Sequence, residues 1–224
     1  MKLEYWSDLS SRFPDAQARC RRGTGDVLVD NGSFGAVLHA VVTHDDGQPV
    51  YDLPIQWDKG GGAVIVPIAP DGGVCFVEQL RPVAAKPDAA GAREPPADLS
   101  LYGRVSLELP RGFSEEGESW EATAIREASE ELRRPISDPV RIGYVNPNTA
   151  TTVHSAGVFV ARAGSAQPGN GYAHHEPGEL IIGRRILSDA QVFGLIAIGE
   201  IFCGFTMAAY LLYLGWRSRS SVSP

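Results

Sequence analysis

The clearest periodic pattern in the chain lies between Gly112 and Arg134. Four apolar residues recur there at helical spacing and would face a core: Ala124, Ile125, Ala128 and Leu132. Ser119 precedes this run and is a residue type that caps helix N-termini, and the acidic residues before it suit the positive end of a helix dipole. The pattern therefore predicts a helix that begins near Ser119.

Short apolar or alternating runs, bounded by turn residues, predict strands on both sides of this helix. The expected strands are 26–30, 35–43, 50–55, 63–68, 74–80, 140–145, 153–161 and 179–182. Near the C-terminus, Ser188 and Gln191 match a capping box that opens a helix, and a second helix is expected over 206–216. The region 192–216 is apolar enough to consider a membrane span, but glycines and a glutamate interrupt it, so paired helices covering a sheet are expected.

The predicted elements group into a small N-terminal unit and a larger domain. Three short strands within residues 1–58 would bury little surface by themselves, so this unit should pack on something else. The domain is expected over residues 59–217, and a disordered tail over residues 218–224. Within the domain, residues 82–104 are rich in proline and alanine and predict a long loop.

The composition of the 224 residues excludes several classes of protein. With 43% hydrophobic and 21% charged residues, the chain can bury an ordinary globular core. Its net charge of −7 argues against non-specific binding to nucleic acid. The three cysteines, Cys20, Cys75 and Cys203, are isolated, which argues against a zinc site or a disulfide framework. The N-terminus lacks the apolar core of a signal peptide, so a cytoplasmic location is expected.

The predicted helix carries acidic residues on one face. Glu127 and Glu131 are four positions apart and Glu127 and Glu130 three apart, so their carboxylates lie close together. Like charges at this spacing repel by ~0.2–0.5 kcal/mol per pair in water. A divalent cation such as Mg²⁺, which takes oxygen ligands, would turn that repulsion into attraction. The alternative is a solvated acidic face with an Arg126–Glu130 ion pair.

The spacing of the charged residues favours the metal site. Gly112 is followed at fixed intervals by Glu118 and by the run Arg126–Glu131. This arrangement closely resembles the signature of the Nudix hydrolases, Gly-x5-Glu-x7-Arg-Glu-U-x-Glu-Glu-x-Gly-U, in which U is apolar. Every charged position matches. The first U is the small Ala128, and the closing Gly-U pair is replaced by Arg133–Arg134.

The resemblance to the Nudix hydrolases implies an α+β fold, an α/β/α sandwich around a mixed sheet, preceded here by the small N-terminal β unit. The metal ligands that it implies are Glu127, Glu130, Glu131 and the backbone carbonyl of Arg111. The expected ion is Mg²⁺, with Mn²⁺ as an alternative. The resemblance also gives Arg126 and Glu130 catalytic roles, with Glu118 orienting Arg126 rather than binding metal.

Two further segments resemble one subgroup of that family, the pyrophosphatases of ADP-ribose and related nucleotide sugars. The sequence FVEQLRP resembles a strand that ends in Gln-x-Arg, which makes Arg81 a phosphate ligand. The sequence ELPRG places Glu108 near metal and substrate. From the residue types alone, Arg81 is also explained as a surface residue at a strand end, and Glu108 as an outward strand residue.

The catalytic base is expected in the glycine-rich loop over residues 164–178. In the relatives this loop is acidic, and one of its glutamates is thought to take a proton from the attacking water. Glu176 matches that place when counted back from the following strand, and Glu179 is the alternative. The neighbouring His174 and His175 would either share proton transfer or solvate the loop.

The function implied by the resemblance is metal-dependent hydrolysis of a nucleoside diphosphate sugar, with ADP-ribose giving AMP and ribose 5-phosphate. One alternative is a Nudix pyrophosphohydrolase that acts on another nucleoside diphosphate derivative or on a phosphorylated metabolite. A second is a non-catalytic binding module, which would be expected to lose the glutamates that this chain keeps. The expected partners are a small nucleotide and a second copy of the chain, with the N-terminal unit serving dimerisation and base stacking. Neither nucleic acid nor a membrane is expected.

Overall fold

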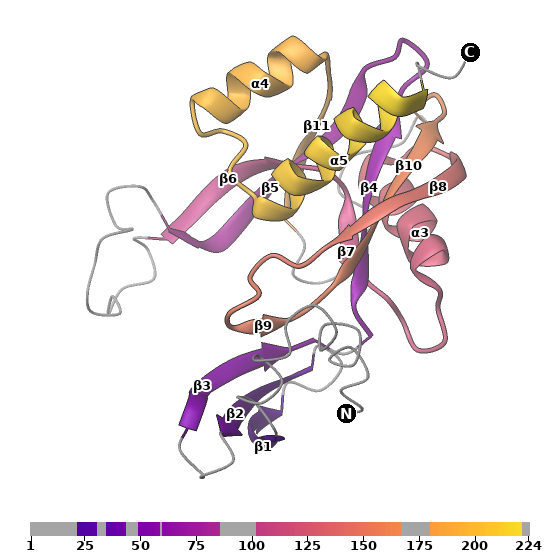
Figure 1. Ribbon diagram of the computed structural model, residues 1–224. Coiled ribbons are helices and arrows are strands. Elements are labelled where there is room, and N and C mark those ends of the chain that lie inside the picture. Colours follow the sequence, from indigo (N-terminus) through magenta and orange to yellow (C-terminus); the bar gives the residue numbers. More distant parts are fainter. Residues whose placement is uncertain are drawn as a thin grey trace. The chain divides into compact units, whose positions relative to one another are not determined.

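The computed structural model describes residues 22–30, 35–43, 49–58, 60–85, 102–166 and 180–220 (Figure 1). These residues form two compact units. The smaller unit comprises the described residues up to Asp58 together with Asn146–His154. The larger unit comprises the described residues of Gly60–Val145 and Ser155–Pro224.

The smaller unit is a four-stranded sheet with the order β1-β2-β3-β9. Its strands are β1 (Arg22–Asp30), β2 (Ala36–Thr43), β3 (Pro49–Trp57) and β9 (Thr152–Val153). The first three pair antiparallel, and β9 adds parallel to β3. Beside this sheet, the buried side chains of His154 and Asp58 meet with 2.7 Å between Nδ1 and Oδ2, and Gln56 donates a hydrogen bond to Asp58.

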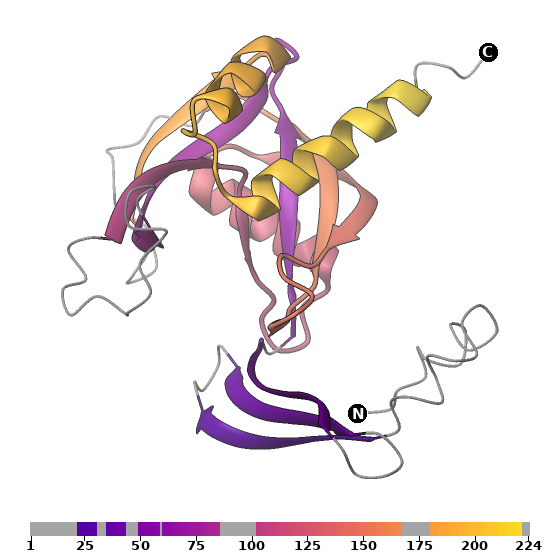
Figure 2. The same ribbon diagram turned by 60° about the vertical axis from the view of Figure 1, so that its left-hand side comes forward.

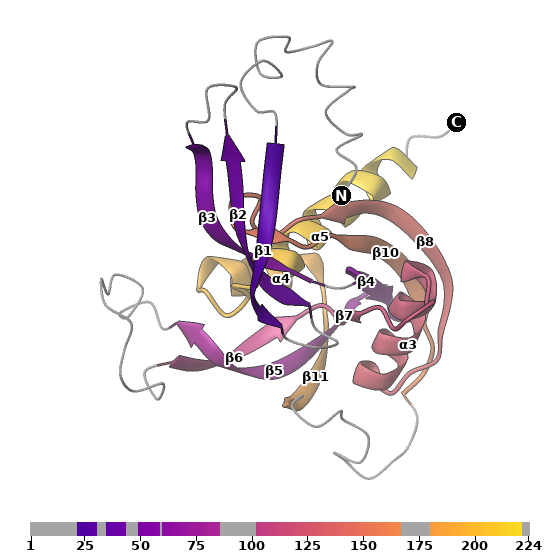
Figure 3. The same cartoon turned by 90° about the horizontal axis from the view of Figure 1, so that it is seen from below.

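The larger unit is built on a seven-stranded mixed sheet with the path β11-β5-β4-β10-β8, to which β6 adds by pairing with β5 and β7 by pairing with β4. Its strands are β4 (Gly62–Ile68), β5 (Val74–Ala85), β6 (Tyr102–Glu108), β7 (Arg111–Phe113), β8 (Ile136–Val145), β10 (Ala156–Ala163) and β11 (Ile181–Leu187). β4 and β10 run parallel, whereas the other pairs are antiparallel. Figure 3 shows β11, β5 and β6 lying side by side.

Helices cover both faces of this sheet. They are α3 (Trp120–Leu132), α4 (Asp189–Ala197) and α5 (Gly204–Ser220). Figure 2 shows α5 crossing in front of the strands while α3 lies behind them. The central strand β4 explains why, because its residues are buried on both sides: Val64 and Val66 pack in the core under α4 and α5, and Ala63 and Ile65 pack in the core under α3. This is the expected α+β sandwich.

The sequence placed several element boundaries wrongly. Strand β5 continues to Ala85 and β6 begins at Tyr102, so both ends of the predicted 82–104 loop are strand; its middle, residues 86–101, lies outside the described residues. The predicted strand 153–161 is two strands, of which the first joins the smaller unit.

The C-terminal helices form as expected, with one difference in length. Gln191 Oε1 accepts hydrogen bonds from Ser188 N at 2.9 Å and from Ser188 Oγ at 3.0 Å, which fixes the start of α4. Helix α5 continues to Ser220, so the first residues of the predicted tail are helical, and residues 221–224 lie outside the described range. None of the helices that the structure describes has the length and apolar character needed to cross a membrane.

Candidate active site

Helix α3 holds the acidic residues in place because its N-terminus and its apolar face are fixed. Ser119 is the N-cap, and its side chain accepts a hydrogen bond from Ala122 N at 3.2 Å. The apolar face packs in the core with Ala124, Ala128 and Leu132. Glu127 and Glu131 are buried too, with residue exposures of 8% and 2%, whereas the Glu130 side chain is 54% exposed. Two carboxylates of this helix are therefore withdrawn from water.

Glu118 holds Arg126 in a two-point contact. Arg126 Nε donates to Glu118 Oε1 and Arg126 Nη2 donates to Glu118 Oε2, both at 3.0 Å. Glu118 Oε2 also accepts from Thr123 Oγ1 at 2.9 Å and from Glu115 N at 3.0 Å. The hydrogen bonds from Arg126 are the main reason why the pKa of Glu118 falls from 4.5 to about 2. Glu118 is thus ionised at neutral pH and faces Arg126.

The rest of the Arg126 guanidinium binds the helix and the strand before it. Nη1 donates to Glu127 Oε1 at 2.8 Å, and Nη2 donates to the carbonyl of Phe113 at 3.0 Å. Glu130 Oε2 lies 3.6 Å from Nη1, so the ion pair expected of a plain acidic helix is present but is the longest of these contacts. The bonds to Glu118 raise the pKa of Arg126, so its positive charge is permanent. Arg126 therefore links Glu118 to Glu127.

Gly112 makes room for the Glu127 carboxylate. It lies in β7, where it pairs with Ala63 of β4. A Cβ atom at Gly112 would fall on the carboxylate carbon and oxygens of Glu127. Only glycine therefore allows this buried carboxylate to lie against the backbone of β7, which is the physical reason for a glycine at the start of the motif.

A second charged cluster surrounds Glu108, at the end of β6. Arg81 donates to it through Nε, 3.0 Å from Oε1, and through Nη2, 2.5 Å from Oε2. Arg111 Nε donates to the same Oε2 at 3.3 Å, and its guanidinium lies 5.1 Å from the centre of the Phe205 ring. Burial alone would raise the pKa of Glu108, but the bonds from Arg81 and the charge of Arg111 outweigh it and lower that pKa. Two guanidinium groups thus share one carboxylate.

The exit of α3 departs from the glycine-containing motif. Arg133 takes the left-handed conformation, φ 54° and ψ 46°, at the position where glycine is usual. Arg134 Nη1 donates to the carbonyl of Gly164 at 2.8 Å, and Arg184 Nε of β11 donates to the carbonyl of Glu131. The turn therefore keeps the geometry of a helix that ends in glycine. The side chains of Arg134 and Arg184 donate hydrogen bonds to backbone carbonyls at or near this turn.

The donor chemistry around α3 fits a hard divalent cation. Glu127, Glu130 and Glu131 offer carboxylate oxygens within two helical turns, and the first and last are buried. Within the described ranges, however, no three His, Cys, Asp or Glu side chains converge closely enough to hold a metal ion as they stand. The Glu127 carboxylate is instead turned to Arg126. The residues therefore suit the ion by type and burial, and metal binding remains a prediction.

The structure brings together two groups of the residues selected from the sequence and leaves others untested. Arg126, Glu127, Glu130 and Glu118 lie in one network, and Arg81 and Glu108 form an ion pair. The proposed bases Glu176 and Glu179, with His174 and His175, lie outside the described residues.

Sequence reasoning missed two arginine side chains. Arg111 was selected only for its carbonyl, although its guanidinium reaches Glu108; the spacing of three residues along the chain was a usable signal. Arg184 was not selected, and no local pattern pointed to it, because its partner Glu131 is 53 positions away.

Comparisons with known proteins place this geometry in a known fold. No family model matches the chain. No curated protein sequence matches it either. Among solved structures, the chain is similar to a "Crystal structure of ADP compounds hydrolase", with a TM-score of 0.61 and 15% sequence identity over 89% of this chain and 96% of that one. At this identity the likeness concerns the fold, and it confirms the Nudix-type fold expected from the sequence.

Proposed function

We propose that this protein hydrolyses the pyrophosphate bond of a nucleoside diphosphate derivative in a metal-dependent reaction. ADP-ribose is the first candidate substrate, with AMP and ribose 5-phosphate as products. The observation that carries the proposal is the arrangement on α3, where Arg126 connects Glu118 to Glu127 while Glu127 and Glu131 are buried. Buried carboxylates are costly without positive charge beside them; Arg126 supplies it to Glu127, and two buried acids four positions apart on one helix favour a metal site over a solvated surface. The fold shared with an ADP compounds hydrolase supports the same class of reaction.

The cluster around Glu108 supports an anionic substrate. Arg81 and Arg111 both donate to one carboxylate oxygen of Glu108, so two positive charges face a single negative one. Their side chains remain 29% and 27% exposed, which leaves guanidinium donors available to a ligand. In a chain with a net charge of −7, such a local excess of positive charge suits the phosphates of a nucleotide.

A pyrophosphate bond resists hydrolysis because its negatively charged oxygens repel an incoming nucleophile. A divalent cation held by Glu127, Glu130, Glu131 and the carbonyl of Arg111 would supply positive charge beside those oxygens and make a water molecule more acidic. Arg81 would hold non-bridging phosphate oxygens in the geometry for attack.

Other residues of the chain complete the proposed reaction. Arg126 acts through Glu127, whose carboxylate it fixes by the 2.8 Å hydrogen bond. Glu176, or Glu179 in its place, would accept the proton of the attacking water. The water oxygen forms a new bond to one phosphorus, the bond from that phosphorus to the bridging oxygen breaks, and the leaving phosphate takes the electron pair.

The test is a panel of nucleoside diphosphate derivatives incubated with the purified chain, with and without Mg²⁺, and assayed for released nucleoside monophosphate. Cleavage of ADP-ribose only with Mg²⁺ is the expected result. Cleavage of a different member of the panel would instead support the alternative Nudix-type pyrophosphohydrolase. Binding of a nucleotide without any cleavage, at every metal concentration, would contradict the enzymatic proposal and favour a binding module.

A homodimer remains part of the proposal. Among the strands that the structure describes, β1 is at the edge of the smaller unit's sheet, and its consecutive residues Val27, Leu28 and Val29 are 62%, 56% and 53% exposed. Exposed apolar residues on an unpaired strand edge favour association with another chain. Sedimentation analysis is expected to give a dimer, and a Val29→Lys change on this strand is expected to weaken it; a monomeric wild-type protein would contradict this part.

A further inference from the structure

The C-terminal half of α3 carries more negative charge than a helix end favours. Glu127, Glu130 and Glu131 all lie in its last two turns, where the helix dipole is itself negative. The helix has no basic residue in its last turn to offset this charge. Its final backbone carbonyls also lack partners within the helix. Arg126 of the same helix pairs with Glu127 and Glu130, so the helix end at Glu131 is where positive charge and hydrogen-bond donors from another element would stabilise α3 most.

Arg184 supplies both from β11. Its Nε donates a hydrogen bond to the backbone carbonyl of Glu131, which satisfies one of the free carbonyls at the helix end. Its Nη2 is buried and has no hydrogen-bond acceptor among the described residues. A buried guanidinium donor without an acceptor destabilises the folded protein, so a functional role for Arg184 at the end of α3 is the question that follows.

The sheet fixes the direction in which Arg184 points. Arg184 stands opposite Val77 of β5, and Val77 packs in the core under α3. The next residue, Arg185, stands opposite Phe76, which belongs to the core on the other face, and its guanidinium lies 3.7 Å from Glu78. Adjacent arginines of one strand therefore serve opposite faces of the sheet, and only Arg184 reaches α3.

The electrostatic environment ties Arg184 to Glu131. Burial, and next the charge of Arg133, lower the pKa of Arg184, whereas the charge of Glu131 acts in the opposite direction. The direct contact between the two residues is the hydrogen bond from Arg184 Nε to the Glu131 carbonyl. Arg133, which follows the last residue of α3 in the left-handed conformation, adds positive charge at the same turn.

We infer that Arg184 is a positioning residue for Glu131: it anchors the last turn of α3 to β11 and so holds the Glu131 carboxylate where a divalent cation can use it. This inference rests on the proposed function, because it assigns Arg184 to the support of that metal site. Removing a residue that hydrogen-bonds to a metal ligand and orients it commonly weakens metal affinity by ~10–100-fold.

The test compares Arg184→Met with Arg185→Met, a matched change at the adjacent position of the same strand. The first readout is the dissociation constant for Mn²⁺ or Mg²⁺ measured by calorimetry on the 224-residue chain. The second is hydrogen exchange of the last α3 turn in metal-free protein. Arg184→Met is expected to weaken metal binding by about ten-fold or more and to speed exchange in that turn. Arg185→Met is expected to change neither.

A third variant separates positioning from folding. Arg184→Lys keeps the positive charge but loses the guanidinium donor geometry, so it should fold and recover only part of the metal affinity. Equal metal affinity in wild type and Arg184→Met would overturn the inference. This holds even if hydrogen exchange became faster, because Arg184 would then stabilise the helix end without affecting metal binding. If wild type binds no metal and cleaves no nucleotide, the proposed function fails with the inference. If wild type does both and Arg184→Met is unchanged, the inference alone fails.

Discussion

Arg126 and Glu118, eight positions apart, meet through two parallel hydrogen bonds of 3.0 Å, and the same guanidinium binds Glu127 at 2.8 Å. Glu118 lies in the loop before α3, so this contact joins the loop to the helix. A displacement of Glu118 would therefore release Arg126 and, through it, the buried carboxylate of Glu127. Glu118 is not a proposed metal ligand, but through Arg126 it influences the position of Glu127, which is one.

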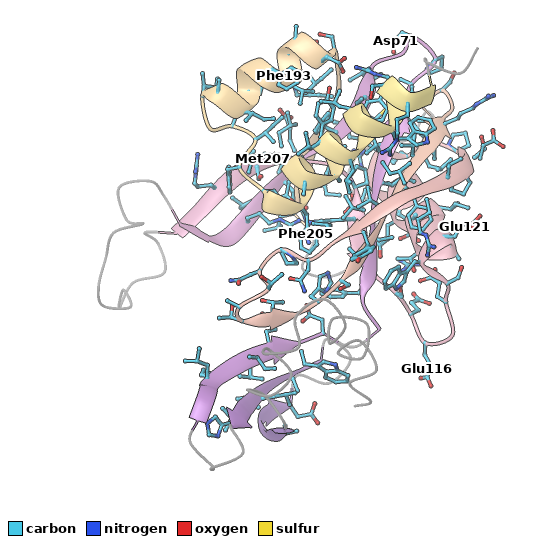
Figure 4. The ribbon with its side chains drawn as sticks, in the orientation of Figure 1. Asp71, Glu116, Glu121, Phe193, Phe205 and Met207 are labelled. Atoms are coloured by element: carbon cyan, nitrogen blue, oxygen red, sulfur yellow. The ribbon has the colours of Figure 1, made fainter. Side chains whose placement is uncertain are left out.

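Replacing Glu118 should destabilise the protein and impair its activity. We expect Glu118→Gln to lower the free energy of unfolding by ~1–3 kcal/mol, since charged hydrogen bonds to a partly buried arginine are lost. Glu116→Gln is the control, because Glu116 is exposed in the same loop (Figure 4) and should change stability little. Denaturant titrations of wild type and the two variants measure stability, and rates of substrate cleavage measure activity. Equal stability of Glu118→Gln and wild type would contradict the role of this contact.

The same contact predicts a dependence of stability on acid. The pKa of Glu118 falls from 4.5 to about 2 in the folded protein, chiefly through its hydrogen bonds with Arg126. A lowered folded pKa contributes stability that is complete above pH 4.5 and is lost as the pH falls toward 2. Wild type should therefore lose more stability over this interval than Glu118→Gln does. Parallel losses in the two proteins, measured by urea titration across the interval, would show that Glu118 does not contribute.

A methyl group at Gly112 should disturb the site directly. Because its Cβ would fall on the Glu127 carboxylate, Gly112→Ala is expected to cost ~1–3 kcal/mol of stability and to weaken metal binding. Gly215 of α5 has no atom within 4 Å of the corresponding position, so Gly215→Ala should stabilise its helix by ~0.5–1 kcal/mol. Thermal unfolding and calorimetry distinguish these results. Unaltered metal affinity in Gly112→Ala would contradict the placement of Glu127.

The side chain of Arg111 should contribute to substrate binding rather than to the stability of the fold. Arg111→Ala is expected to raise KM about ten-fold, equivalent to ~1.4 kcal/mol, with a smaller change in kcat. The reason is the loss of one of the two guanidinium groups at Glu108. Arg162→Ala is the matched control, because the Arg162 side chain is 82% exposed and its only described ion pair, to Asp138, spans 3.7 Å. Steady-state kinetics with a substrate that the protein cleaves measure KM and kcat. An unchanged KM in Arg111→Ala would contradict a role of Arg111 in substrate binding.

Arg133 should be replaceable with a gain in stability. Its left-handed backbone costs an L-residue ~1–2 kcal/mol, which glycine avoids at a smaller entropic cost. Arg133→Gly is therefore expected to raise the free energy of unfolding by ~0.5–1 kcal/mol. Arg133→Ala removes the same charge but keeps the strain, so it should bring no such gain. Two variants of equal stability would mean that charge, and not conformation, determines the effect.

The sequence predicted those parts of the fold that depend on local patterns. The periodic apolar face, the Ser119 cap and the fixed spacing from Gly112 to Glu131 all lie within one short stretch of chain, residues 112–132, and α3 formed as expected. The apolar run at 63–68 likewise predicted strand β4, which the structure shows to be buried on both faces.

The parts that the sequence could not supply depend on pairing between distant segments. Strand β9 has two residues, too few to show a period, and it exists because it pairs with β3. Strand β5 continues past Pro82, which usually ends a strand, because β6 pairs with it as far as Ala85 across an irregular register. Arg184 reaches α3 only because β11 lies beside β5. None of these relationships leaves a local signal.

The central claim is that the buried acids of α3 bind a divalent cation that the reaction requires. Glu131→Gln tests it most directly when compared with Glu121→Gln, an exposed acid of the same helix (Figure 4). The measurement is the rate of Mg²⁺-dependent cleavage of the best substrate in the panel. We predict that Glu131→Gln lowers this rate by ~100-fold or more while Glu121→Gln stays close to wild type. Equal rates in all three proteins, or cleavage that does not need Mg²⁺, would contradict the claim.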